Sequence, residues 1–427
     1  MFYPPPFLQF IHVSNVLPFA DVFTNGNMLS MISTEFLYIL SALLPMLTMP
    51  IVLPMVVLMA RRKRLTDNPN ARKMQDRPVA VMGGTVIMLV LCITSIVLNL
   101  FYDLSSLFPA MCVMVILYIF GMLDDNIGLS WKFKLVMQIF AILLLFFGGY
   151  NGVDSMYGLF GLNDMPLWAS FLLTVYSGLL LFNAVNFVDG IDGLASGLGV
   201  LAGAVMGYWN VCHGFTTQAI LSFIVVGVMV SFFFFNVFSE RYKMYMGDSG
   251  SLVLGLFIFI LACPDTYYAV ENEFLVDRYF VSFLVALLSA MIFDLFRVVI
   301  MRMLKGKSPF EPDRTHLHHA YVDLGMSHLL ATLKIMMQNI AVVVVWFLTA
   351  MTEMNVAMQF IVVLVAGIVF LWMPYFFLEY LKNNHISFYI KISKRCKRHS
   401  DRLEVVGDWI RRILDGRRKQ LISHSIK

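Results

Sequence analysis

The segment NAVNFVDGIDG, residues 183–193, places amides and carboxylates at the end of an apolar run long enough to enter a membrane. Asn183, Asn186, Asp189 and Asp192 recur at every third position, so adjacent members are neighbours on a helix surface. Ionisable groups at membrane depth cost at least ~2.5 kcal/mol each on insertion scales, so they normally face a protein interior or an aqueous cavity. The segment is therefore a candidate for chemistry at a membrane boundary.

Other acidic residues adjoin apolar runs in the same way. Asp124 and Asp125 stand in GMLDDNIGL, Asp248 in MGDSGSL and Asp294 in MIFDLFR. Each of them alone could simply terminate a helix, because Asp is common near membrane boundaries. Taken as a set, with a paired Asp and glycines beside Asp189 and Asp248, they predict one acidic cleft.

The residue types in this cleft predict a hard cation that works with phosphates. Carboxylates without cysteine partners suit Mg²⁺, or Mn²⁺, rather than Zn²⁺, and Mg²⁺ usually binds through one or two carboxylates plus phosphate oxygens. The five cysteines form no CxxC pair, so neither a disulfide framework nor a zinc site is expected. Cations that could hold phosphates occur in two nearby segments and comprise Lys132, Lys134, Lys305, Lys307 and Arg314.

A cluster of histidines follows in the segment SPFEPDRTHLHH. His318 and His319 are adjacent in sequence and cannot share a helix face, which disfavours a metal site built from all three histidines. Together with His316 and the neighbouring Arg314, they can donate hydrogen bonds to anionic oxygens. We therefore expect phosphate contact here, and metal ligation is the alternative.

The elements that must position these residues are strongly apolar. Of 427 residues, 59% are hydrophobic and only 14% are charged, which is unlike soluble globular domains. Segments of about 17–25 apolar residues match helices that cross a hydrocarbon layer of about 30 Å. The sequence thus predicts an all-α polytopic integral membrane protein with about 11 transmembrane helices. They are expected near residues 37–60, 79–102, 105–123, 135–150, 167–188, 194–212, 218–238, 250–263, 279–300, 329–350 and 357–380.

The basic residues set the expected orientation. With the N-terminus outside and the C-terminus cytoplasmic, nearly all of the 31 Lys and Arg residues fall on the cytoplasmic side. Residues 1–36 are then an outer segment, 37–380 the multi-span domain and 381–427 a basic cytoplasmic tail. The start of the chain lacks a basic region before an apolar stretch, so no cleaved signal peptide is expected.

The tail combines basic clusters with apolar residues such as Trp409 and Ile413. This mixture is typical of an amphipathic helix that lies on the anionic lipids of an inner leaflet. A disordered basic tail is the alternative. Neither form would be catalytic.

Four segments carry a resemblance to a known family. GMLDDNIGL, NAVNFVDGIDGLASG, MGDSGSLVLG and SPFEPDRTHLHH resemble, in order and spacing, the signature motifs of the polyprenyl-phosphate N-acetylhexosamine-1-phosphate transferases, over about residues 65–330. Members of that family have ten or eleven membrane helices and a cytoplasmic active site. The resemblance implies Mg²⁺-dependent transfer of a sugar 1-phosphate from a UDP-sugar to undecaprenyl phosphate, with release of UMP, in a bacterial inner membrane.

The resemblance also implies roles for individual residues. Asp248 would be the main Mg²⁺ ligand, with Asn186 or Asp189 close to the same ion. Asp124 and Asp125 would form an acidic pair near the lipid phosphate, and these two and Asp189 are the expected catalytic residues.

The other implied roles concern substrate contact. Asp192 would lie near the nucleotide or its phosphates, because Gly190 is expected to end the helix and turn Asp192 into the following loop. The complete set expected to contact substrate is Lys73, Lys134, Asn183, Asp192, Arg314, His316, His318 and His319.

The resemblance leaves the donor and the mechanism open. The HLHH pattern resembles the N-acetylglucosamine branch, which favours UDP-N-acetylglucosamine and a product that initiates a lipid-linked cell-surface glycan, such as lipopolysaccharide O-antigen or a cell-wall polymer. Another UDP-N-acetylated sugar (galactosamine, 6-deoxyhexosamine or muramoyl-pentapeptide form) is the first alternative, and an ion-coupled transporter is the second. Direct attack by the lipid phosphate is preferred over a covalent intermediate. Membrane lipids and a second copy in a homodimer are the further partners considered, and no nucleic acid is expected.

Overall fold

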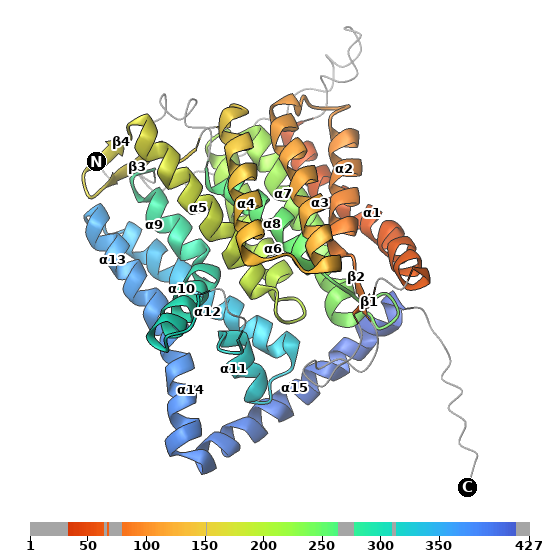
Figure 1. Cartoon of the computed structure of the whole chain (residues 1–427), viewed down its shortest axis with the longest axis vertical. Coiled ribbons are helices and arrows are strands. Elements are labelled where there is room, and N and C mark those ends of the chain that lie inside the picture. The colour runs from red at the N-terminus through yellow and green to blue at the C-terminus, as the bar shows by residue number, and fades with distance from the viewer. Residues whose placement is uncertain are drawn as a thin grey trace, which may run out of the picture.

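The computed structural model describes residues 33–63, 66–67, 79–150, 152–263, 277–309 and 313–415. Lys73, one of the expected substrate contacts, lies outside these ranges. So do residues 1–32, to which the signal-peptide prediction refers. Within the described ranges the chain is almost entirely helical, and long helices run side by side (Figure 1).

The first part of the chain forms α1 (Thr34–Arg62), α2 (Gly83–Leu98), α3 (Phe108–Ile127), α4 (Trp131–Phe147), α5 (Leu167–Val188), α6 (Leu194–Cys212), α7 (Thr216–Phe238) and α8 (Gly247–Ala262). The second part forms α9 (Phe280–Leu287), α10 (Ser289–Leu304), α11 (Leu317–Asp323), α12 (His328–Ala350), α13 (Val356–Gly367), the π-helical turn η7 (Ile368–Trp372), α14 (Met373–Asn384) and α15 (Ile386–Leu414). Short 3₁₀ turns, η4 (Ser105–Leu107) and η6 (Asp277–Tyr279), precede α3 and α9.

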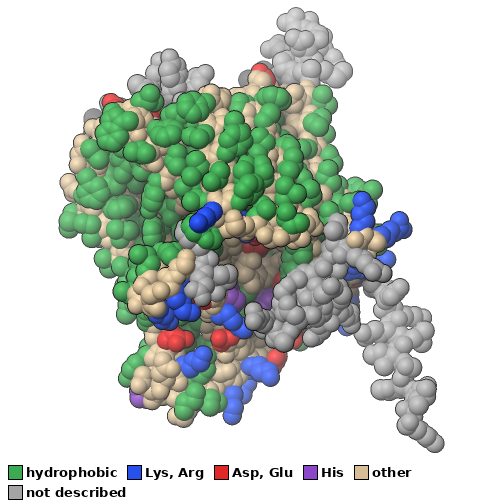
Figure 2. All heavy atoms as spheres, viewed as in Figure 1, with side chains coloured by type: hydrophobic (Ala, Val, Ile, Leu, Met, Phe, Trp, Pro, Cys, Tyr) green, Lys and Arg blue, Asp and Glu red, His purple; other side chains and the backbone are tan. Residues whose placement is uncertain are grey.

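The membrane-spanning character is evident from helix length and surface. Seven of the described helical segments are long and apolar enough to cross a membrane, and α9 with α10 adds an eighth if the bent pair is one span. Leu47, Ile51 and Met55 are exposed at a four-residue spacing along α1, as a lipid-facing stripe requires. Figure 2 shows hydrophobic side chains over the bundle and charged ones gathered towards one end. The prediction of an all-α polytopic membrane protein is confirmed.

Every predicted span coincides with a helix, but the second is shorter than expected. Residues 79–102 were expected to be one span, whereas Val79–Val81 forms strand β2 and α2 begins only at Gly83. Strand β2 pairs in parallel with β5 (Met244–Tyr245) and antiparallel with β1 (Thr66–Asp67). This small sheet ties the segment before α2 to the segment before α8. A separate hairpin, β3 (Ser155–Leu159) with β4 (Leu162–Asp164), precedes α5. Eleven crossings with an outer N-terminus stay a prediction.

The ninth predicted span is broken. α9 and α10 meet at an angle of 75°. The buried side chain of Asn339 on α12 accepts from the backbone N–H of Ala290 at 2.8 Å and from Ser289 Oγ at 3.0 Å, and it donates to the carbonyl of Leu287 at 2.9 Å. A break inside a hydrocarbon region needs such partners, because lipid cannot satisfy the freed backbone groups.

The basic tail forms the long helix α15, which runs back beneath the bundle from the end of α14 (Figure 1). Ser400 Oγ in its middle accepts from the backbone N–H of Ser327 at 2.8 Å. Asp415 just after its end accepts from Ser239 Oγ at 2.5 Å. The helix is therefore attached to the protein at two places, and its contact with lipid stays a prediction.

Candidate active site

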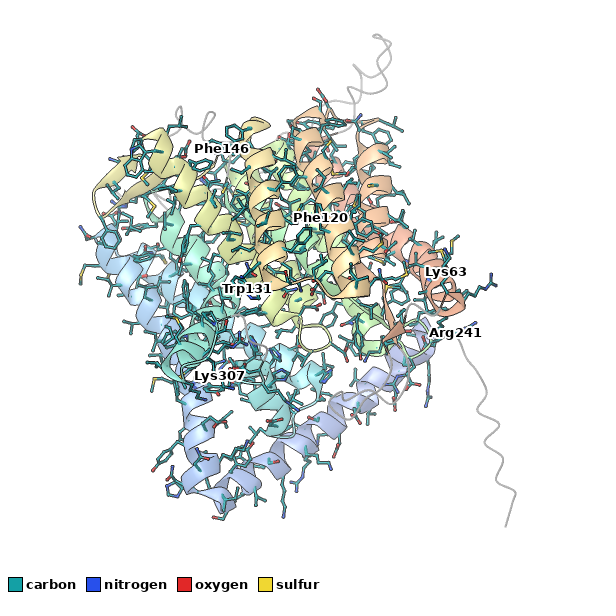
Figure 3. All side chains as sticks on the ribbon, viewed as in Figure 1. Lys63, Phe120, Trp131, Phe146, Arg241 and Lys307 are labelled. Atoms are coloured by element: carbon teal, nitrogen blue, oxygen red, sulfur yellow. The ribbon has the colours of Figure 1, made fainter. Side chains whose placement is uncertain are left out.

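The C-terminal parts of α3 and α5 and the N-terminal parts of α4 and α8 enclose a small acidic pocket. Its polar lining is contributed by all four helices and consists of Asp124, Lys134, Gln138, Asn183, Asn186 and Asp248. Phe120 of α3 is part of the apolar lining, and Figure 3 shows it on the half of α3 nearest Trp131, the first residue of α4. Residues that are far apart in sequence thus meet where several apolar helices end.

Asp248 is the centre of this pocket. Lys134 Nζ donates to its Oδ2 at 2.8 Å, and Asn186 Nδ2 donates to its Oδ1 at 2.8 Å. Lys134 also forms an ion pair with Asp124, which in turn accepts from the backbone N–H of Leu129. One lysine therefore serves two carboxylates, and the negative charge of the pocket is only partly compensated.

The Asp pair separates into two roles. Asp125 does not line the pocket but accepts hydrogen bonds from the backbone N–H of Asp248 at 2.7 Å, from the backbone N–H of Ser249 at 3.1 Å and from Ser249 Oγ at 2.7 Å. It therefore caps the N-terminus of α8. Gly247, with φ +72°, packs against this carboxylate, and a Cβ there would overlap it. Asp125 thus fixes the main chain that carries Asp248.

Asp189 follows α5 directly and is partly accessible. Its partial withdrawal from water, together with the neighbouring carboxylates of Asp248 and Asp125, raises the pKa of Asp189 well above its usual value. Crowded carboxylates of this kind are the setting in which a divalent cation binds. Asp189 does not line the acidic pocket but lies near enough to Asp248 for the two charges to repel. Asp248 and Asp189 are therefore the residues that would hold a Mg²⁺ ion, and Asn186 would have to turn its amide oxygen towards it.

Asp192 lies in the turn between α5 and α6, as expected, but Gly190 is not the residue that ends the helix. α5 ends at Val188, before Gly190, and the left-handed residue is Gly193, with φ +84°. Asp192 Oδ2 is 2.7 Å from Lys243 Nζ and 2.8 Å from His328 Nδ1. Burial opposes ionisation, but these two partners outweigh it and lower the pKa of Asp192 below its usual value.

The three histidines come together beside this turn. The rings of His316 and His318 lie 5.3 Å apart and nearly parallel, and those of His318 and His319 lie 4.3 Å apart. His318 is buried, and a Cβ at Gly190 would overlap its ring. Burial, aided by nearby positive charge, lowers the pKa of His319 to about 4. The histidine cluster therefore packs directly against the 189–193 turn.

A metal site among the histidines is disfavoured by its carboxylate. Ligand atoms of Asp294, His316 and His318 all lie within 4.8 Å of one another. However, Asp294 already accepts from the Arg297 guanidinium at 2.6 Å, so a cation there would face a buried positive charge. Phosphate contact remains the better interpretation of the cluster.

The other predicted substrate contacts, Asn183 and Arg314, do not lie in the histidine cluster. Asn183 lines the acidic pocket and donates to Gln138 Oε1 at 2.9 Å. Arg314 is largely exposed and pairs with Asp323 at 3.2 Å. Arg302 of α10 holds the loop before the histidines through Asp313, with contacts of 3.0 and 3.2 Å.

Several residues of the site escaped sequence reasoning. Gln138, Lys243 and His328 are brought in from segments that contain no motif. Lys243 could have been suspected, because it stands shortly before the GDSG turn. His328 gives no local signal, since it is simply the first residue of a membrane helix.

The apolar bundle and the acidic pocket at the ends of its helices are what a membrane glycosyl transferase would require. Residues 107–264 match the model of glycosyl transferase family 4, and this match confirms the resemblance inferred from the motifs.

Particular relatives match a longer part of the chain. The chain is 28% identical over 271 residues to the undecaprenyl-phosphate alpha-N-acetylglucosaminyl 1-phosphate transferase of Escherichia coli (strain K12), covering 63% of this chain and 72% of that protein. It is 28% identical over 298 residues to the probable undecaprenyl-phosphate N-acetylglucosaminyl 1-phosphate transferase of Bacillus subtilis (strain 168), covering 70% and 80%. The alpha-N-acetylglucosaminyl enzyme of Salmonella typhi is 27% identical over 267 residues, covering 62% and 70%.

Proposed function

We propose that this protein transfers N-acetylglucosamine 1-phosphate from UDP-N-acetylglucosamine to undecaprenyl phosphate, releasing UMP. The reaction takes place at the cytoplasmic face of a bacterial inner membrane and starts a lipid-linked cell-surface glycan. The observation that carries the proposal is Asp248, which lies in a partly neutralised acidic pocket beside Lys134 and Asn186. The sugar and the lipid are those named for the related transferases of Escherichia coli and Bacillus subtilis.

Mg²⁺, or Mn²⁺, is the proposed cofactor, with Asp248 as the main ligand and Asn186 and Asp189 beside it. When bound, it would neutralise phosphate charge and act as a Lewis acid. The residues of the chain do the rest. Lys134 offers a second positive charge in the same pocket, and the histidine cluster with Arg314 offers donors to the diphosphate.

A direct attack by the lipid phosphate fits this arrangement best. A phosphate oxygen is already largely ionised near neutral pH, so little help from a base is needed. Asp124 is held by Lys134 and by the backbone N–H of Leu129, and Asp125 is held by the start of α8. Neither carboxylate is thus free to act as a covalent nucleophile without giving up its partners.

A different UDP-N-acetylated sugar is the principal alternative. The contacts described above concern the metal and the phosphates, which all such donors share, and not the sugar ring. The transporter alternative is disfavoured by the arrangement of charges. Charged side chains gather towards one end of the bundle (Figure 2), whereas a transport path requires polar residues that can be reached from both sides.

The test uses purified protein with Mg²⁺, undecaprenyl phosphate and a panel of radiolabelled UDP-sugars. We expect UMP and a labelled diphosphate lipid, formed fastest from UDP-N-acetylglucosamine. If another UDP-sugar reacts fastest, the proposed donor is wrong but the proposed type of reaction stands. Absence of UMP with every donor would refute the transferase function.

A further inference from the structure

The acidic residue Asp294 lies outside the acidic pocket and has no role in the reaction proposed above. It stands on α10, is 6% exposed, and packs beside the start of the helix that carries the histidines. Its neighbour on the same helix, Arg297, is only 1% exposed. A buried ion pair at such a place costs solvation energy and is weak evidence for stability, so its contacts need an explanation.

Both oxygens of Asp294 are committed to the histidine segment. Oδ2 lies 2.8 Å from Nδ1 of His316, and Oδ1 accepts from the backbone N–H of Leu317 at 3.0 Å. Oδ1 also accepts from the guanidinium of Arg297 at 2.6 Å. The carboxylate thus holds the ring of His316 and the first turn of α11 at once.

The Asp294 carboxylate is also held indirectly by α14, through Arg297. The guanidinium of Arg297 lies 3.8 Å from the ring centre of Tyr375 on α14, within the range of a cation–π contact. On the other side, the ring of Phe187 meets the ring of His316 edge to face at 5.3 Å. The imidazole is therefore fixed both at its nitrogen and at its face.

We propose that Asp294 is a positioning residue that holds His316 through Nδ1 and leaves Nε2 as the ring nitrogen that meets a substrate phosphate. A carboxylate on one ring nitrogen sets the tautomer and orientation of an imidazole, and it stabilises the ring when both nitrogens carry protons to donate. Arg297 and Tyr375 keep the carboxylate in place. The inference rests on the proposed transferase function, because the substrate phosphate comes from it.

The test compares Asp294→Asn, His316→Gln and the double variant in the UMP-release assay. If Asp294 acts through His316, Asp294→Asn lowers kcat by about 10–100-fold with KM for the donor changed less than about twofold. The double variant is then no slower than His316→Gln alone. Losses that multiply in the double variant would overturn the proposal, as would full activity of Asp294→Asn.

Loss of folding has to be separated from loss of positioning. Asp294→Asn leaves Arg297 as an unpaired buried charge, so Asp294→Asn/Arg297→Gln is the second variant, because it removes both charges together. We expect this pair to elute as a folded protein and to show the same fall in kcat. Ser289→Ala is the matched control, since it removes a buried hydrogen bond from the same helix and should leave kcat unchanged.

A readout without substrate distinguishes this inference from the proposed function. NMR of the protein labelled with ¹⁵N-histidine, with the His316 signal identified from His316→Gln, should show a proton on Nδ1 that is lost or shifted in Asp294→Asn. An unchanged His316 signal would refute the positioning role even if UMP is released. Failure of UMP release with the expected NMR change would refute the transferase function instead.

Discussion

The acidic pocket and the histidine cluster are built on opposite principles. In the acidic pocket, Lys134 is shared between Asp124 and Asp248, and side chains of Lys134 and Asp248 are 39% and 31% exposed. In the histidine cluster, Asp294 pairs with both Arg297 and His316, and all three side chains are almost completely buried. The pocket has two carboxylates for one lysine, whereas the carboxylate of Asp294 is matched by Arg297, His316 and the backbone N–H of Leu317. Cofactor and substrate should therefore stabilise the first region more than the second.

The largest expected effect comes from the centre of the pocket. Asp248→Asn removes the charge that would hold the metal, and we expect turnover to fall by at least about 10²–10³-fold while the protein stays folded. UMP release measures the effect, and size-exclusion elution with thermal unfolding checks the fold. Asp408→Asn on α15 is the matched control and should keep full activity. Substantial turnover by Asp248→Asn would remove this residue from the metal site.

The second largest effect should come from removing the metal, which should affect the acidic pocket and not the histidine cluster. Chelation is expected to abolish UMP release, and added Mg²⁺ or Mn²⁺ to restore it. Mg²⁺ at 100 times its Kd should also stabilise the wild-type fold by ~2.7 kcal/mol, because it binds the native pocket. The midpoint of thermal unfolding should rise in wild type and in Asp294→Asn but not in Asp248→Asn. An equal rise in all three proteins would place the cation elsewhere.

Asp125 tests whether both members of the Asp pair act on substrate. Because its carboxylate caps α8, Asp125→Asn should lower the free energy of unfolding by about 1 kcal/mol, as expected for loss of a helix cap. Activity should fall less than in Asp248→Asn. Chemical denaturation measures the free energy of unfolding, and the UMP assay measures the activity. A complete loss of activity with unchanged stability would instead make Asp125 a direct participant.

The smallest effect should come from acidification of the histidine cluster. The pKa of His319 is about 4, chiefly because of burial, against 6.5 for a free histidine. The folded state thus disfavours the charged ring, so the stability contributed by His319 is complete above about pH 6.5 and is lost as the pH falls towards 4. Thermal unfolding between pH 7 and 5 should be less pH-dependent in His319→Gln than in wild type. Identical pH profiles would contradict this origin.

Much of the fold could be predicted because its signal is local. Length and apolarity placed a helix at every expected span, and GMLDDNIGL, NAVNFVDGIDG and MGDSGSL each carry a residue of the acidic pocket. The division of labour between Asp124 and Asp125 could not be predicted, because it depends on where the start of α8 lies relative to α3. Spacing along one chain says nothing about such a contact.

The unpredicted contacts share one property: each joins segments distant in sequence. Lys243 and His328 meet Asp192 from the segment before α8 and from the start of α12. The break between α9 and α10 depends on Asn339, which is an ordinary polar residue in the sequence of another helix. Such partners become visible only when the packing of the helices is known.

The return of α15 beneath the bundle has a consequence for the order of biosynthesis. Its attachment points, Ser327 before α12 and Ser239 after α7, belong to segments that emerge from the ribosome much earlier than Asp415. The face of the bundle along which α15 runs therefore cannot take its final form until the last residues of α15 have been made. A nascent chain that ends before α15 can insert its membrane helices but leaves these two places without their partner, so completion of translation is itself a step in maturation.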